Sequence, residues 1–180
     1  MKASQRGRRA FSTYEIAYLA MVVAACVVGR TMFQFIPNVQ PMTAIFLILT
    51  LQLGIFRGLI VNVLALLITN FYMGMGVWTI SQILSFSMVI ICMGLLCHWQ
   101  YFNKNRWLQI VFSVFAGFLY GFVIAGIDVQ IYQIGHFWPY YFAGLYFDLL
   151  HALGNGIFYF LLAPIFMRFG QKLLSIKNVS

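Results

Sequence analysis

The side chains that could take part in catalysis are few in this chain. Its 180 residues include three acidic residues and three histidines. No Walker A motif, no GxSxG motif and no HExxH motif is present. Asp128 and Asp148 could in principle pair as an acid dyad. However, Asp128 is expected at a helix end and Asp148 about two turns into the next helix, so the sequence does not bring them together. We therefore do not expect an enzyme.

The cysteines give no sign of a metal site or of a disulfide framework. Cys26, Cys92 and Cys97 are odd in number and lie within apolar runs, without the paired spacing of metal ligands. Free cysteines in such runs behave as small packing hydrophobes. We expect no metal site and no cofactor of the chain's own.

Residues 30–43, RTMFQFIPNVQPMT, have the features of a binding loop. Pro37 and Pro41 remove backbone donors and prevent a continuous helix. Between them, Asn38 and Gln40 carry amides that can both donate and accept hydrogen bonds. Irregular backbone at membrane depth is tolerated only where protein or a water-filled cavity covers it. A loop that lines a ligand site meets that requirement.

Arg30 is the only cation in its part of the chain and follows an apolar run. A buried arginine costs roughly 2.5–3.5 kcal/mol at the centre of a membrane helix and less near its end. One interpretation is that the side chain snorkels to outer headgroups. The other is that it faces a cavity and pairs with Asp128, with Asp148 or with an anionic ligand group.

Polar residues also form a line in the last apolar segment. Asp148, His151 and Asn155 fall at positions i, i+3 and i+7, on one face of a helix, and Tyr141 and Gly144 extend that face. Such groups should face the bundle interior or water and not lipid. Either they form an interhelical network that fixes packing, or the upper end of the line contributes to a ligand cavity.

Further polar and aromatic residues gather at the expected outer edge. Asn62, Asn70 and Gln82 pose the same choice between packing and binding. The aromatic residues there fit an interfacial belt, or could stack on a flat ligand. The candidate substrate-binding residues are Arg30, Phe35, Asn38, Gln40, Asn70, Tyr72, Trp78, Gln82, His136, Trp138, Tyr141 and Asp148.

The elements that must position these residues are membrane helices. The chain is 63% hydrophobic and 8% charged, with a mean hydropathy of +0.90, whereas a soluble domain carries about 25% charged residues. The net charge of +8 is split among short clusters at the termini and in loops, which follows the positive-inside rule and not a nucleic-acid-binding stripe. We predict an all-α integral membrane protein with one domain.

Six spans with both termini in the cytoplasm account best for the charges. The expected spans are residues 14–33, two short helices between 42 and 69 that meet at 56–58, then 78–97, 108–127 and 140–167. A single broken span over 42–69 would put the basic loop 98–107 outside the membrane. The expected organisation is a basic cytoplasmic tail (1–13), a six-helix domain (14–168) and a cytoplasmic tail (169–180), with outer loops at 70–77 and 128–139.

Small residues spaced by four mark possible helix contacts. Ala20 and Ala24 in the first span, and Gly117, Gly121 and Ala125 in the fifth, follow the small-xxx-small pattern. Internal packing is the usual use of this pattern. If the pair in the first span faces outward, it offers a docking surface for another membrane subunit.

Three segments together resemble one family. FIPNVQPMT (35–43), TNFYMGMGVWTISQ (69–82) and DLLHALGN (148–155) are similar to the S components of energy-coupling factor (ECF) vitamin transporters, and most to the group that includes the cobalamin-specific S component. The resemblance spans residues 14–168. It implies an S-component bundle in a bacterial cytoplasmic membrane that captures a vitamin at its outer face.

The resemblance also implies partners and a division of labour. The S component docks on a transmembrane coupling protein, and two ABC ATPase subunits hydrolyse ATP with Mg²⁺. Ala20 and Ala24 would lie on the surface that meets the coupling protein. Cobalamin is the first expected substrate, with pantothenate, folate or a queuosine precursor as alternatives. A non-transport membrane scaffold or assembly protein is the competing class.

Overall fold

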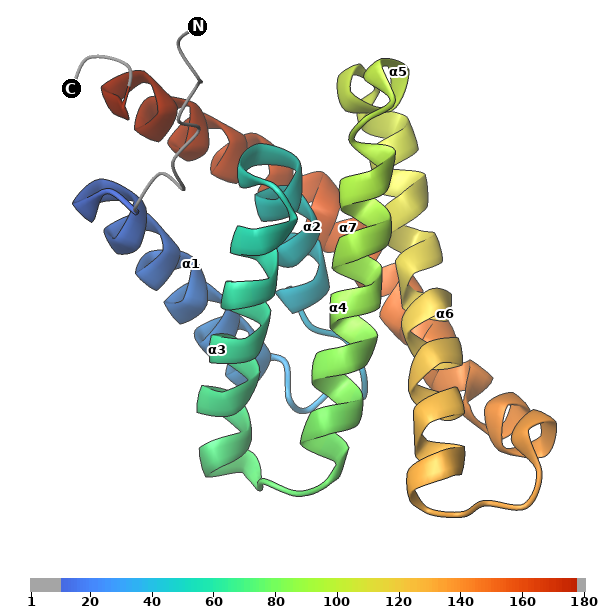
Figure 1. Ribbon diagram of the computed structural model, residues 1–180. Coiled ribbons are helices and arrows are strands. Elements are labelled where there is room, and N and C mark those ends of the chain that lie inside the picture. Colours follow the sequence, from blue (N-terminus) through green and yellow to red (C-terminus); the bar gives the residue numbers. More distant parts are fainter. Residues whose placement is uncertain (1–10, 178–180) are drawn as a thin grey trace, which may run out of the picture.

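The computed structural model describes residues 11–177, and this part of the chain folds into seven helices with no strand. In chain order the helices are α1 (Thr13–Met32), α2 (Met42–Leu53), α3 (Ile55–Met73), α4 (Trp78–Leu96), α5 (Gln100–Lys104), α6 (Arg106–Ile131) and α7 (Phe137–Lys177) (Figure 1). The expected basic tail falls mainly on residues 1–10, which lie outside the described residues, as do residues 178–180.

Five of these helices are long and apolar enough to cross a membrane, namely α1, α3, α4, α6 and α7. Residues 11–177 are therefore all-helical in their regular structure, and their apolar helices indicate a multi-pass membrane protein. The sixth expected span corresponds to α2, which has twelve residues. That length is about 18 Å of helix, too short on its own for a hydrocarbon core of about 30 Å.

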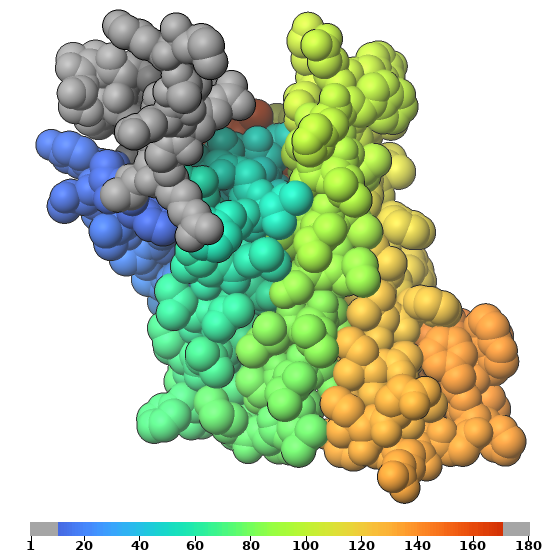
Figure 2. Space-filling view, viewed as in Figure 1, coloured from blue at the N-terminus to red at the C-terminus, as the bar shows by residue number. Residues whose placement is uncertain are grey.

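The connections lie at two opposite ends of the molecule. One end carries the start of α1, the α2–α3 turn, α5 and the far end of α7 (Figure 1). We call it the α5 end. The other end, which we call the loop end, carries the α3–α4 loop (residues 74–77) and the α6–α7 loop (residues 132–136). In the space-filling view the start of α7 projects beside α6 at one corner of the loop end (Figure 2).

Both connections at the loop end are shorter than the sequence predicts. Helix α3 continues through Asn70 to Met73, because the Asn70 side chain is buried against α4 and not in contact with solvent. Gly74, with a φ of 117°, then ends the helix. The expected loop 70–77 is therefore 74–77. The expected loop 128–139 shrinks to 132–136, because α6 and α7 each extend farther than predicted.

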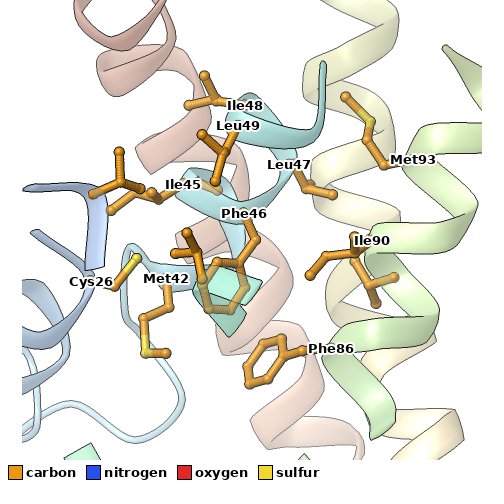
Figure 3. Packing of buried hydrophobic residues seen from close by; sticks show 14 of the residues in the cluster. Cys26, Met42, Ile45, Phe46, Leu47, Ile48, Leu49, Phe86, Ile90 and Met93 are labelled. Atoms are coloured by element: carbon orange, nitrogen blue, oxygen red, sulfur yellow. The ribbon is translucent and has the colours of Figure 1, made fainter. Parts of the chain in front are cut away.

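The short helix α2 forms the centre of the bundle. Its residues 42–50 are all buried, and it contacts α1, α3, α4, α6 and α7. A helix that is covered on every side must be apolar nearly all round, which explains the run of hydrophobic residues 44–49; the hydroxyls of Thr43 and Thr50, on either side of that run, are hydrogen-bonded. Figure 3 shows this packing, with labels on Ile45, Phe46, Leu47, Ile48 and Leu49 of α2, on Phe86, Ile90 and Met93 of α4, and on Cys26 and Met42.

Helix α7 continues past Pro164 to Lys177, so the proline does not end it. A proline inside a helix leaves the carbonyl four residues earlier without its usual N–H donor. Here that carbonyl belongs to Phe160, and the Arg106 guanidinium donates to it at 2.6 Å. The Arg106 guanidinium also lies over the Phe160 ring, 5.5 Å from its centroid. The start of α6 therefore satisfies the acceptor that Pro164 leaves free.

Small residues bring α6 and α7 close together. A Cβ atom added at Gly117 would lie 2.5 Å from the backbone nitrogen and Cα atoms of Ala152. The small-residue pattern of α6, which includes Gly117, therefore serves internal packing against α7. In contrast, Ala20 and Ala24 on α1 face outward and are exposed.

This close approach gives a matched test of stability within one helix. We expect Gly117→Ala to lower the free energy of unfolding by about 1–3 kcal/mol, because the added methyl group meets backbone atoms that cannot move aside. Gly126→Ala is the control, since the nearest atom to its Cβ would be 4.0 Å away, on Phe137. Thermal unfolding in detergent measures both variants, and equal midpoints would contradict the proposed contact.

Candidate binding site

Residues 33–41 form the irregular connection between α1 and α2. The backbone turns twice, with hydrogen bonds from Ile36 N to Phe33 O (3.0 Å) and from Val39 N to Ile36 O (3.2 Å). Asn38 has a φ of 57°, in the left-handed region that asparagine tolerates better than most residues. The two prolines thus exclude a helix here, as the sequence predicts, and the backbone folds back toward the bundle.

His151 of α7 holds this connection in place. Its Nδ1 lies 2.8 Å from the carbonyl oxygen of Asn38, and its Nε2 lies 3.0 Å from the hydroxyl oxygen of Thr43. A carbonyl can only accept, so Nδ1 donates, and in the neutral ring Nε2 accepts from the hydroxyl. The ring is 1% exposed. His151 therefore fixes both the loop and the first turn of α2 against α7.

A cavity of about 430 Å³ lies between this connection, α6 and α7. Its polar groups include the Asp148 carboxylate and the tyrosines Tyr140 and Tyr141, while Gly121 and Gly144 leave space on facing helices. The complete lining is Pro37, Asn38, Gly121, Ile124, Ala125, Tyr140, Tyr141, Ala143, Gly144, Phe147 and Asp148.

A second, smaller cavity of about 170 Å³ lies on the other side of the same loop. Arg30 lines it and donates to the Thr69 hydroxyl at 2.7 Å. In the described part of the chain no ion pair joins Arg30 to either aspartate. The complete lining is Arg30, Phe33, Gln34, Ile36, Pro37, Asn38, Val39, Gln40, Met73, Gln82 and Tyr120. Of the two interpretations of Arg30, the cavity-facing one fits this geometry.

The two cavities adjoin, because Pro37 and Asn38 line both of them. The loop therefore stands between a cavity that contains a carboxylate and one that contains a guanidinium group. Six of the twelve candidate residues from the sequence come together here, namely Arg30, Asn38, Gln40, Gln82, Tyr141 and Asp148.

The other six candidates do not line either cavity. Asn70 is 1% exposed and donates to the Gln82 carbonyl oxygen at 2.8 Å and to the Thr79 hydroxyl at 3.0 Å, so it positions Gln82 from behind. The Tyr72 hydroxyl is hydrogen-bonded to that of Thr31. The remaining four candidates, which are exposed at or near the loop end, are Phe35, Trp78, His136 and Trp138. The three aromatic residues among them, all except His136, fit an aromatic belt.

The polar line on α7 divides between packing and the cavity. His151 belongs to a buried hydrogen-bond network, while Asp148 lines the larger cavity. Asn155 is fully buried, and neither of its amide atoms has a hydrogen-bond partner among the described residues. The packing interpretation of this helix face therefore applies to His151, and the cavity interpretation applies to Asp148.

Tyr120 is the main site residue that the sequence reading missed. It lines the smaller cavity and packs against His151, with ring centroids 5.1 Å apart. A signal was present, because Tyr120 directly precedes Gly121 in the small-residue pattern of this helix. Phe147 also lines the larger cavity, but it lies within an apolar run and carries no distinguishing signal.

The arrangement is suited to holding a solute by hydrogen bonds and ring contacts. It offers amides, one carboxylate, one guanidinium and several aromatic rings around two partly open cavities, which is the usual make-up of a small-molecule site. Among the described residues no group of histidine, cysteine and acidic side chains could hold a metal ion.

No protein-family model, no curated protein and no solved structure matches this chain.

The role of His151 can be tested by substitution. We expect His151→Leu to lower the free energy of unfolding by about 1–3 kcal/mol, because the Asn38 carbonyl and the Thr43 hydroxyl lose their partner. Amide hydrogen exchange of residues 36–40 should become faster. His98→Leu, at an exposed position in the turn after α4 whose ring nitrogen Nδ1 is hydrogen-bonded to the carbonyls of Gly94 and Leu95, is the control. Unchanged exchange in this loop would show that His151 does not hold it.

Proposed function

We propose that this protein is the substrate-binding S component of an ECF-type ABC importer in a bacterial cytoplasmic membrane. The observation that carries the proposal is the pair of adjoining, partly open cavities around residues 33–41, set among helices of membrane-spanning length. Irregular backbone, hydrogen-bonding side chains and a hollow beside them fit a solute site. The bound solute would pass to a transmembrane coupling protein while two partner ATPases hydrolyse ATP.

The distribution of basic residues supports an orientation with the loop end outside. Arg57 at the start of α3, Lys104 in α5, Arg106 at the start of α6 and Arg168 near the end of α7 belong to the α5 end. Under the positive-inside rule that end faces the cytoplasm. With α2 counted as a short sixth membrane element, both termini of the bundle are cytoplasmic.

Access to the site from the loop end also supports this orientation. Pro37 and Asn38 are exposed, and Tyr140 and Tyr141 lie in the first turns of α7, directly after the α6–α7 loop. All four line the larger cavity. A solute that arrives from outside would therefore meet the larger cavity first.

The enclosed volume bears on the choice of substrate. Drug-sized ligands occupy pockets of about 300–1,000 Å³, and the two cavities measure about 430 Å³ and 170 Å³. Cobalamin, the first substrate that the resemblance implies, is much larger than a drug-sized molecule and would have to extend over the exposed loop. The volume therefore favours the smaller alternatives, which are pantothenate, folate and a queuosine precursor.

The exposed face of α1 supports a docking role. Ala17, Ala20 and Ala24 are exposed along one side of the helix, so this surface has no bulky side chains where they lie. Small residues allow another helix to approach closely within a membrane. We propose that the coupling protein docks on Ala20 and Ala24.

Binding can be tested with the purified protein and a panel of micronutrients. We expect one of them to raise the unfolding temperature, because a ligand that binds only the folded state stabilises it by about 2.7 kcal/mol at a hundred times its Kd. Gln40→Ala should weaken that ligand about three- to tenfold through loss of a hydrogen bond. Phe35→Ala, in the same loop but outside both cavities, should not. If no micronutrient of the panel raises the unfolding temperature, a scaffold or assembly protein is favoured instead.

Docking can be tested separately from binding. We expect Ala24→Trp to reduce co-purification of the coupling protein and to reduce uptake in cells that express all subunits, because the indole ring holds the partner helix away. Ligand-dependent stabilisation of the isolated protein should be unchanged. Leu153→Trp places the same ring at an exposed position on α7 and serves as the control. Equal loss in both variants would argue against α1 as the docking surface.

A further inference from the structure

The distribution of acidic residues singles out the larger cavity. The chain has three acidic residues, and Glu15 forms an ion pair with Arg57 at 2.8 Å. Asp148 lines the larger cavity, and Asp128 contacts Tyr140, another residue of its wall. Two of the three acids in a strongly basic protein therefore lie beside one enclosed space.

The Asp148 carboxylate is nearly buried and has no partner within the described protein. It is 6% exposed, and no hydrogen bond or ion pair to it is found. The side chain points across the interface toward α6, where its oxygens occupy the space that a Cβ on Gly121 would need. A carboxylate that is largely withdrawn from bulk water, and that faces a cavity without a donor from the protein, is costly unless a cation or hydrogen-bond donors compensate it.

No other charge in the cavity wall compensates Asp148. None of the eleven lysines and arginines is among the lining residues. Asp128 lies behind the wall of the cavity and adds to its negative potential, because no cation pairs with this carboxylate among the described residues. One of its oxygens accepts from the Tyr140 hydroxyl at 3.4 Å, and the other is buried without a partner. The Arg30 guanidinium lies in the smaller cavity, which Tyr120 also lines, and not in the wall of the larger one.

The shape and chemistry of the remaining wall favour a flat ring. Tyr140, Tyr141 and Phe147 supply aromatic surfaces, and Gly121 and Gly144 carry no side chain that would fill the space. Aromatic faces attract cations as well as other rings. A planar group with a positive charge is therefore complementary to both features of the cavity.

We propose that the larger cavity binds the cationic, N–H-donating group of a flat heteroaromatic solute, with the Asp148 carboxylate as its counter-charge. This inference rests on the proposed function and narrows its substrate class to amine- or amidine-bearing heteroaromatics. An anionic vitamin would meet the Asp148 carboxylate here, with Asp128 behind Tyr140, and would be disfavoured. The cation of the solute replaces the donors that Asp148 lacks in the protein.

Two probes with the same ring and different charge test this inference. The first is 7-aminomethyl-7-deazaguanine, which is cationic, and the second is its neutral 7-cyano analogue. We expect the wild-type protein to bind the cationic probe about ten- to a hundredfold more tightly, as a charge-assisted hydrogen bond allows. Asp148→Asn, which keeps the side-chain volume, should abolish that preference and retain the neutral probe. Binding of the neutral probe also shows that the variant is folded.

The possible outcomes separate this inference from the proposed function. Equal binding of both probes by the wild type, or an unchanged preference in Asp148→Asn, overturns the inference. It is also overturned if no cationic heteroaromatic stabilises the wild type, whereas stabilisation by pantothenate or cobalamin in the same assay would leave the proposed function standing. A cation preference without uptake in cells that express the coupling protein and ATPases would contradict the proposed function instead.

Discussion

His151 donates to the Asn38 carbonyl and accepts from the Thr43 hydroxyl, and these two hydrogen bonds hold the inner side of an irregular backbone segment against a bundle of apolar helices. In hydrocarbon, each backbone group without a partner costs several kcal/mol. Two prolines make a helix between α1 and α2 impossible, so the backbone groups on the inner side of the segment need partners elsewhere, while residues 34–38 are exposed at the surface. The packing of α7 against the inner side of the segment, and with it the position of both cavities, follows from this requirement.

The same requirement explains why α2 is short and central. Because residues 33–41 turn back within the bundle, α2 begins below the loop end and reaches the α2–α3 turn after twelve residues. Its neighbours then cover residues 42–50 on all sides, which the largely apolar sequence of this stretch permits. The space that α2 does not fill near the loop end remains as the two cavities, and polar side chains from α1, α4, α6 and α7 reach them.

Local sequence predicted the helices and the irregular segment well, because hydropathy and proline act at short range. It predicted the loop boundaries less well. Asn70 looks like a loop residue, but its amide is buried and hydrogen-bonded to Gln82, so α3 continues past it. The division of polar residues between packing and cavity also depends on tertiary neighbours. Neither helical spacing nor residue type separates His151, which serves the network, from Asp148, which faces open space.

The length of α7 has a mechanical consequence. Its 41 residues correspond to about 61 Å of helix, roughly twice the thickness of a hydrocarbon core, so a helix of this length fits a bilayer only when it is strongly tilted or extends beyond the lipid. Asp148 and His151 lie in its first half, and Arg106 contacts its second half from α6. A rotation of this helix about the cavity near its start would therefore move its far end through the greatest distance.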